Sequence, residues 1–497
     1  MLMRSPAANG SSRRSFWPRV REFAVPPSMI ETATARRAVG DWAGACAAAG
    51  VDTDLDLRSV ARSHGLDLAA RVRRDLRHLA PDLLRWHMPR TAPDGLLRPG
   101  LTAALARYDP EGGGEPVLLV VRTPPARADA GQRMSLALWS RRGADAVAHR
   151  HPHPHPDQRF RLDLHRHLWD ARRTGELPSR SGADLLSHLP SDLPPGDPDP
   201  YRLLPPDHGC AVGRWAAEAA LLLHTDGRRA DGAVAVRLGA RHRLVAHLLP
   251  PPGGNGPPTV RLSAPPDGGR GLPVLPDAAT WVLPDLELLR AGLVDADRLH
   301  PLVAAALAPG HRSAPPVAGG SATGNAEPAP GGRPRMVECR GAMHRIALVD
   351  GVLAPLDHGP DEVRREELLT ALTGTPLPCL RAIDEAHRHP ERLPDVRALL
   401  DHGDIARALA VVEDLLGPQA RLRAGTLRDE LEAAALRRID HGLFRAGLDD
   451  PARCPRRGSS RHGRAAGSAH DSPPDPPDGR LVPNSSSHDG ARRSPRR

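Results

Sequence analysis

The sequence contains no lysine, so arginine supplies all 68 of its basic residues. A guanidinium keeps its proton at any working pH and cannot act as an amine nucleophile, which excludes Schiff-base chemistry on a lysine. The phosphate loop of Walker-type NTPases and the nucleotide site of protein kinases each need a lysine as well. The composition therefore excludes the standard forms of three enzyme classes, while a GC-rich genome accounts for the arginine bias.

Cysteine is scarce too, and the five cysteines at positions 46, 210, 339, 379 and 454 form no CxxC pair. This odd, scattered set is typical of a reducing compartment and predicts neither a disulfide framework nor a cysteine zinc site. Arg13-Arg14 imitates a twin-arginine export signal, but no apolar run follows it. No run approaches the roughly 18 apolar residues of a membrane span. We therefore expect a cytoplasmic protein without a membrane partner.

Positive charge is concentrated at the two ends of the chain. The formal net charge is +9, of which residues 1–30 carry +4 and residues 451–497 carry +6, so the remainder sums to −1. Arginine-rich tails can bind nucleic acid without sequence specificity. However, no aromatic residue stands among the arginines of 451–497 to stack on bases. We expect solvating tails, with non-specific nucleic-acid binding as an alternative function.

Proline and glycine, 55 and 47 residues, punctuate the chain and suggest folded blocks separated by linkers. We expect an α+β fold with an N-terminal helical domain, a β-rich middle region with Pro/Gly linkers, and a C-terminal β-hairpin plus helical domain. The expected parts are a disordered basic tail (1–28), a helical domain (29–110), a mixed β-rich domain (115–250), linkers with a short helical segment (251–334), a β-hairpin plus helical domain (335–450) and a disordered Arg-rich tail (451–497).

Hydrophobic periodicity predicts the main elements. Leu68, Val72, Leu76, Leu79 and Leu83 recur at the 3–4 spacing of one helix face, as do Ala35, Ala38, Val39, Trp42 and Cys46. Short apolar runs at 117–122, 134–140, 234–238, 244–249 and 260–262 read as strands, whereas 211–225 fits either a helix or a strand. Asp350-Gly351 predicts a hairpin turn, and 360–448 reads as helical.

Two segments repeat one local pattern: residues 39–45 (VGDWAGA) and 402–408 (HGDIARA). In each, a glycine can end one helix in a left-handed conformation while the following aspartate caps the next helix. Locally this resembles the Gly-Asp turn inside tetratricopeptide repeats, which are protein-binding helical hairpins. The 34-residue period of that family is absent.

A histidine-rich segment is the boldest candidate for chemistry. His149, His151, His153 and His155 alternate with other residues, and His165 and His167 follow. Imidazoles in this pattern can converge on Zn²⁺, so His151, His153, His155, His165 and His167 are the candidate metal ligands and residues 149–167 the core of a possible metal-dependent hydrolase. Pro152, Pro154 and Pro156 favour a solvated linker instead.

No other catalytic constellation survives inspection: the sequence has no GxSxG, HExxH or GxGxxG motif. We therefore predict a non-enzymatic interaction or scaffold protein that contacts other proteins through helical hairpin surfaces. A metal-dependent hydrolase and a nucleic-acid-binding protein remain the alternatives.

Overall fold

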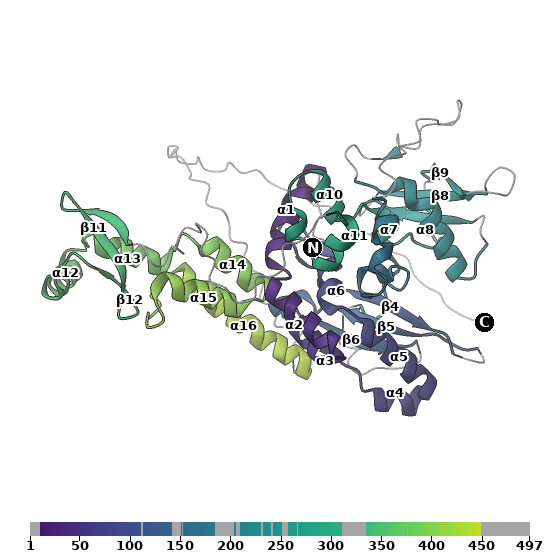
Figure 1. Ribbon diagram of the computed structural model, residues 1–497, viewed down its shortest axis with the longest axis horizontal. Helices are drawn as coiled ribbons and strands as arrows, with labels where there is room; N and C mark the ends of the chain where they lie inside the picture. The colour runs from purple at the N-terminus through teal and green to yellow at the C-terminus, as the bar shows by residue number, and fades with distance from the viewer. Residues whose placement is uncertain are drawn as a thin grey trace, which may run out of the picture. The chain divides into compact units, whose positions relative to one another are not determined.

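The computed structural model describes residues 10–448, apart from 111–112, 142–150, 152, 184–202, 205–208, 230–231, 240–241, 251–256, 266, 311–333 and 375. Helices and several small sheets make a mixed α+β fold, as the sequence predicts (Figure 1). The expected tail 451–497 lies outside the described residues, as do His149 and Cys454. No described helix is both long and apolar enough to cross a bilayer.

A four-stranded sheet organises the first part of the chain, in the order β1-β6-β5-β4. Its strands are β1 (Val51–Thr53), β4 (Thr102–Tyr108), β5 (Val117–Arg122) and β6 (Met134–Trp139). β1 runs parallel to β6, and the other pairs are antiparallel. The structure confirms the predicted strands β5 and β6. However, β4 lies inside the range expected to be helical, and the sheet crosses the expected boundary at residue 110.

Helices pack on this sheet around a large apolar core. They are α2 (Pro27–Ala38), α3 (Trp42–Ala48), α4 (Leu57–His64), α5 (Leu66–His78) and α6 (Pro81–His87). The predicted stripe of five leucine and valine residues from Leu68 to Leu83 is buried throughout, whereas Val39 is 80% exposed. Val39 differs because it follows the end of α2 and starts the turn into α3.

Residues 10–28 are not the unstructured tail that the sequence suggests. Helix α1 (Gly10–Phe23) buries Val20 and Arg21 against α6 and α10 (Pro284–Arg290). Arg21 donates to Asp285 at 2.8 Å and to the carbonyl oxygen of Trp86 at 2.8 Å. Its guanidinium also lies 4.3 Å from the centroid of the Trp86 ring. The sequence did not predict this helix, because its apolar face is short and is interrupted by charged residues and Pro18.

The middle of the chain forms a second sheet, β7-β8-β9, packed on α8. Its elements are β7 (Ala233–Arg237), β8 (Arg243–Leu249), β9 (Thr259–Ser263) and α8 (Val212–Thr225), so the ambiguous segment is a helix. Trp215 of α8 is fully buried in this second core. The remaining elements here are β2 (Arg90–Thr91), β3 (Leu96–Leu97), α7 (Leu177–Ser181), α9 (Asp277–Thr280) and α11 (Pro301–Leu307).

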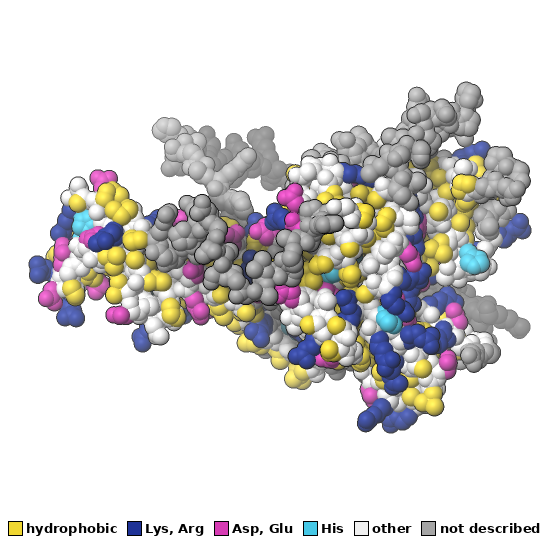
Figure 2. All heavy atoms as spheres, viewed as in Figure 1, with side chains coloured by type: hydrophobic (Ala, Val, Ile, Leu, Met, Phe, Trp, Pro, Cys, Tyr) yellow, Lys and Arg dark blue, Asp and Glu magenta, His cyan; other side chains and the backbone are white. Residues whose placement is uncertain are grey.

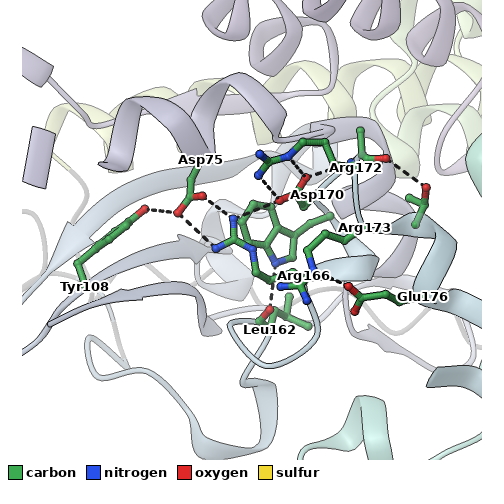
Figure 3. A network of polar contacts seen from close by, with 11 residues as sticks. Asp75, Tyr108, Leu162, Arg166, Asp170, Arg172, Arg173 and Glu176 are labelled. Carbon is green, nitrogen blue, oxygen red and sulfur yellow. Dashed lines mark hydrogen bonds and ion pairs between the residues drawn. The ribbon is translucent and has the colours of Figure 1, made fainter. Parts of the chain in front are cut away.

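A network of ion pairs joins α5, β4 and the segment before α7 (Figure 3). Tyr108 donates its hydroxyl to Asp75 at 2.9 Å, and Arg166 pairs with both Asp75 and Asp170. Arg172 also donates to Asp170, at 3.0 Å. Burial opposes ionisation of Asp170, but its hydrogen bonds with Arg172 outweigh that effect and lower its pKa. These contacts fix residues 166–172 against the first core.

Residues 335–388 form a sheet and two helices, the third unit, whose small core adjoins through Leu353 that of the helices that follow. Its elements are β10 (Arg335–Cys339), β11 (Ala342–Val349), β12 (Val352–Pro355), α12 (Pro360–Thr373) and α13 (Pro378–Arg388). The predicted hairpin is confirmed: Val349 pairs with Val352, and Asp350 and Gly351 both adopt positive φ in the turn. Only five buried residues make its core, and two of them are Cys339 and Cys379.

Three helices complete the described chain: α14 (Leu393–His402), α15 (Ile405–Leu416) and α16 (Thr426–Ala446). Both Gly-Asp turns have the predicted caps: Asp41 accepts a hydrogen bond from the Gly44 amide and Asp404 from that of Arg407. Gly403 also touches another part of the chain, because a Cβ placed on it would lie 2.4 Å from the carbonyl oxygen of Gly131.

This close approach gives a matched pair of substitutions. Gly40 and Gly403 have similar left-handed φ values of 79° and 89°, but a Cβ on Gly40 meets nothing within 4 Å. Gly40→Ala should therefore lose about 1–2 kcal/mol from backbone strain alone. Gly403→Ala adds a clash with backbone, and we expect a clearly larger fall in the thermal midpoint. Equal midpoints for the two variants would mean that the turn does not dock on Gly131.

The buried side chain of Arg85, on α6, binds three segments that are far from one another in the sequence. Its guanidinium donates to the carbonyl oxygens of Ala24 at 3.0 Å, Gln132 at 2.6 Å and His402 at 3.1 Å. Burial lowers the pKa of Arg85 to about 10, with a smaller contribution from Arg133. Arg85 thus binds backbone carbonyl groups instead of a carboxylate. Its hydrogen bond to His402 joins α14 to the first core.

Candidate functional site

The histidines from 151 to 155 do not converge. His151 is buried, and its Nε2 lies 2.8 Å from the carbonyl oxygen of Thr123. His153 and His155 are exposed, and the ring of His155 stands edge-on to Trp139. Among the described residues these three side chains therefore have separate neighbours. Their role as metal ligands stays a prediction.

His165 and His167 do lie together, with their ring centroids 5.7 Å apart in the interior. Nε2 of His165 lies 3.2 Å from Glu218 on α8, and Arg180 binds the same carboxylate at 2.6 Å. Burial opposes ionisation of Glu218, but the hydrogen bonds of His165 and Arg180 outweigh it and lower its pKa to about 2. Arg214 pairs with the same carboxylate at 3.2 Å, so Glu218 has three partners, as in a structural ion-pair network.

A second buried group surrounds Asp285. This carboxylate accepts from Arg21 and from Nε1 of Trp86 at 3.1 Å, and Nε2 of His87 lies 3.8 Å away. Burial is the main cause that lowers the pKa of His87 to about 4. Imidazoles and carboxylates thus gather in the interior, but here too they are paired with one another.

A small surface pocket, partly open to solvent, is lined by residues that do not include His165 or His167. Its lining includes His151, Asp52, Arg133 and Arg445. Burial opposes ionisation of Asp52, but hydrogen bonds with His441 and Arg133 lower its pKa. Arg445 pairs with Asp54 as well. Asp52, Arg133 and Arg445 are therefore paired within the protein, and Arg122 adds a further positive charge to the lining.

In the third unit, the fold brings together three possible metal ligands that are far apart in the sequence. One ligand atom each of Cys339, His358 and Cys379 lies within 4.8 Å of the other two. Cys339 ends β10, His358 follows β12, and Cys379 begins α13. Both thiols are fully buried, and the His358 side chain is 3% exposed. The only signal in the sequence was two cysteines within the same expected domain, since no short motif joins them.

Hydrogen bonds prepare His358 as a ligand. Its Nδ1 lies 3.3 Å from Glu362 of α12, while its Nε2 is buried without a hydrogen-bond partner among the described residues. The contact with His358 is the main cause that lowers the pKa of Glu362. Burial, and then the neighbouring Cys339, raise the pKa of Cys379 to about 11. The ring of His344 stacks on His358 with centroids 4.5 Å apart.

Large exposed apolar side chains are most frequent in the same part of the protein. Figure 2 shows that hydrophobic side chains of all sizes reach the surface there and elsewhere on the visible face. Among the described residues, 17 large hydrophobic side chains are exposed, and 13 of them lie between Met336 and Leu448. That stretch holds fewer than a third of the described residues. Scattered exposed hydrophobics are normal, but a concentration of this kind is typical of an interaction surface.

One face of the β10–β12 sheet belongs to this surface. Residues paired across an antiparallel ladder share a face, so Met336, Met343, Val349 and Val352 lie on the side opposite Cys339. All four are exposed, and Met343 is 57% exposed. An antiparallel sheet usually turns polar residues toward water on its open face. Here four large apolar residues share the open face with Glu338 and Arg345, which lie directly opposite the two methionines.

Helix α12 exposes a further apolar group. Leu368, Leu369 and Leu372 are all exposed, the last of them at 84%, and the helix has no buried residue. Arg340 pairs with Glu362 and Glu366 and ties the helix to the turn between β10 and β11. A helix of this length gains little stability without a packed apolar face.

Comparison with known proteins gives no match: the chain matches no protein-family model, no curated protein and no solved structure.

Proposed function

We propose that this protein is a non-enzymatic interaction protein, and that residues 335–448 bind another protein through an exposed apolar surface. The concentration of 13 of the 17 exposed large hydrophobic residues in this stretch carries the proposal. The proposed surface comprises the open face of β10–β12 and the leucines of α12, which together hold seven of these 13 residues. The other six, Leu356 and five residues from Leu409 to Leu448, lie outside it. The proposed surface differs from the hairpin surfaces expected from the sequence, because α14 and α15 bury most of their apolar face in a core of their own.

The neighbouring undescribed segments do not supply apolar residues to cover this surface. Residues 311–333 contain Val317 as their single large aliphatic residue, and residues 449–497 contain Leu481 and Val482. These two segments are therefore poor candidates to cover the surface, and the proposed occupant is a separate protein with an apolar contact surface. Met336 and Met343 suit such a role, because unbranched methionine side chains adapt to the shape of a partner.

The polar groups of the interior support a binding role over hydrolysis. Glu218, Asp285 and Asp52 are each held by arginine or histidine partners within the fold. A hydrolytic site needs a nucleophile or metal beside an accessible base. The surface pocket has His151 and Asp52 in its lining, but His151 binds Thr123 and Asp52 binds Arg133.

The double variant Met343→Glu, Val352→Glu tests the surface, with Leu66→Glu as its matched control, because Leu66 is 81% exposed on α5. Crosslinking in the native host followed by mass spectrometry identifies proteins joined to residues 335–448. We expect the purified partner to bind the wild type and the control equally and the double variant at least tenfold more weakly in calorimetric titration.

Two results would overturn the proposal. Equal binding by the double variant would remove the surface from consideration. Light scattering that gives twice the chain mass for the wild type and a single mass for the double variant would show that a second copy, rather than another protein, covers the face.

A further inference from the structure

We propose that Cys339, His358 and Cys379 form a structural zinc site that holds together the small unit of residues 335–388. The inference is independent of the proposed partner, because it concerns the opposite face of the β10–β12 sheet. The three side chains come from three separate elements, so a bound ion would join β10, the end of β12 and α13 at one point.

The atom types and distances suit zinc. Zinc prefers thiolate sulfur and imidazole nitrogen, with bonds of about 2.3 Å and 2.0 Å. A tetrahedron with those bonds places its ligand atoms roughly 3.5–3.8 Å apart. The three atoms here lie within 4.8 Å of one another, so a contraction of about 1 Å completes the geometry. Small rotations of three side chains are sufficient for that change.

The hydrogen bonding of His358 matches that of a metal ligand. Glu362 accepts from Nδ1, which leaves the lone pair on Nε2 free to bind an ion. A carboxylate behind a ligating imidazole is the usual second partner of zinc-bound histidine, because it fixes the tautomer and the ring orientation. Nε2 is also buried without a hydrogen-bond partner among the described residues. A bound ion would satisfy this nitrogen.

Cys379 lies in the covered core beside Cys339, so its thiolate needs an ion to neutralise it. The residue is in the first turn of α13, an eleven-residue helix whose N-terminal amides and dipole stabilise negative charge. Cys339 lies at the end of a strand on the covered face of the sheet. Zn²⁺ neutralises two thiolates, so the complete site carries no net charge in the core.

His344 supports the position of His358. Its ring stacks on His358 with an interplanar angle of 15°, and it lies on the face of the sheet that carries Cys339. Its ring nitrogens do not belong to the group of atoms within 4.8 Å of one another, so the three protein ligands leave one position of a zinc tetrahedron for a water molecule.

The core of the third unit is small, so a bound ion would add stability there. This core contains five buried residues, Cys339, Ile346, Leu377, Cys379 and Ile383. A core of this size supplies little stability, and small natural scaffolds add disulfides or metals for that reason. Without an ion, two of the five positions contribute only small side chains. Zinc binding would add its own free energy to the folding of this unit.

The test uses the untagged full chain, purified from medium with zinc, and elemental analysis of the protein. We expect one zinc per chain in the wild type and none in Cys339→Ser or Cys379→Ser. Cys46→Ser and Cys210→Ser are the matched controls, since both are buried free cysteines outside the site. Substitution with Co²⁺ should give a thiolate-to-cobalt charge-transfer band that the two site variants lack and the controls retain.

Two further variants separate ligation from packing. Glu362→Gln should keep the stoichiometry but weaken zinc affinity about 10–100-fold in a chelator competition. The triple variant His151→Ala, His153→Ala, His155→Ala should leave the charge-transfer band unchanged, which removes the histidine-rich segment as its source. Zinc that survives both serine variants, or a native mass two hydrogens lower with Cys339 and Cys379 linked and no zinc, would overturn the proposal.

Discussion

Asp285→Ala should lower the free energy of unfolding by about 3–5 kcal/mol, because it leaves the buried Arg21 cation without its carboxylate. Asp285 accepts two hydrogen bonds from Arg21 and Trp86, and both Arg21 and Asp285 are almost fully inaccessible to solvent. Removal of one partner from such a pair costs far more than the pair itself contributes. Urea unfolding followed by tryptophan fluorescence measures the loss, since Trp86 lies against both groups.

The control for this prediction is an exposed ion pair between the same parts of the chain. Glu22 of α1 lies 3.8 Å from Arg298, and both side chains are about half exposed. Glu22→Ala should therefore change stability by less than about 1 kcal/mol. A similar small effect for Asp285→Ala would show that water reaches Arg21 and that α1 does not dock as described.

Stability should fall steeply as the pH is lowered from about 6.5 toward 4, because buried histidines must remain neutral in the folded chain. Burial is the main cause that lowers the pKa of His402 to about 3 and that of His87 to about 4, from 6.5. Between these values and 6.5 the unfolded chain binds protons that the folded chain does not. Each histidine therefore removes about 1.4 kcal/mol per pH unit in that window and nothing above it.

His402→Leu isolates one of these contributions. Its Nδ1 is buried without a partner among the described residues, and Arg85, Arg90 and Arg19 oppose its protonation. Leucine has a similar volume and cannot bind a proton, while the backbone carbonyl that Arg85 binds is retained. We expect unfolding curves of the variant to lose about 1.4 kcal/mol per pH unit less than the wild type below pH 6.5. Parallel curves would contradict a neutral, buried His402.

Local signals in the sequence predicted much of the secondary structure and little of the tertiary structure. The leucine stripe from Leu68 to Leu83, the strands β5 and β8 and the Asp350-Gly351 turn follow from periodicity and turn chemistry, which act within a few residues. β4 escaped prediction because its residues TAALARY contain four alanine or leucine residues that favour helices, and pairing with β5 overrides that preference. The helix α1 depends on Asp285, which is 264 residues away from Arg21.

The candidate site was also difficult to predict from the sequence, because its residues are far apart along the chain. Five histidines drew attention because they are close in sequence, yet the structure brings together only His165 and His167 among them. Cys339, His358 and Cys379 are separated by a hairpin and a helix, and only the packing of α13 under the sheet assembles them. Similarly, the alternation of side chains along β11 does not show which face of the sheet is buried in the protein. Both faces carry apolar residues, so the exposed one emerges only from the packing.

The binding of carbonyl groups by Arg85 has a consequence for synthesis on the ribosome. His402 is made 317 residues after Arg85, which corresponds to roughly 15–60 s at ordinary elongation rates of about 5–20 residues per second. During that interval the guanidinium has the carbonyl groups of Ala24 and Gln132 but not that of His402, so we expect part of it to stay hydrated. We therefore expect the packing around Arg85 to be completed only after α14 has been translated. Nascent chains that stop before α14 should expose more of the first core to chaperones and proteases.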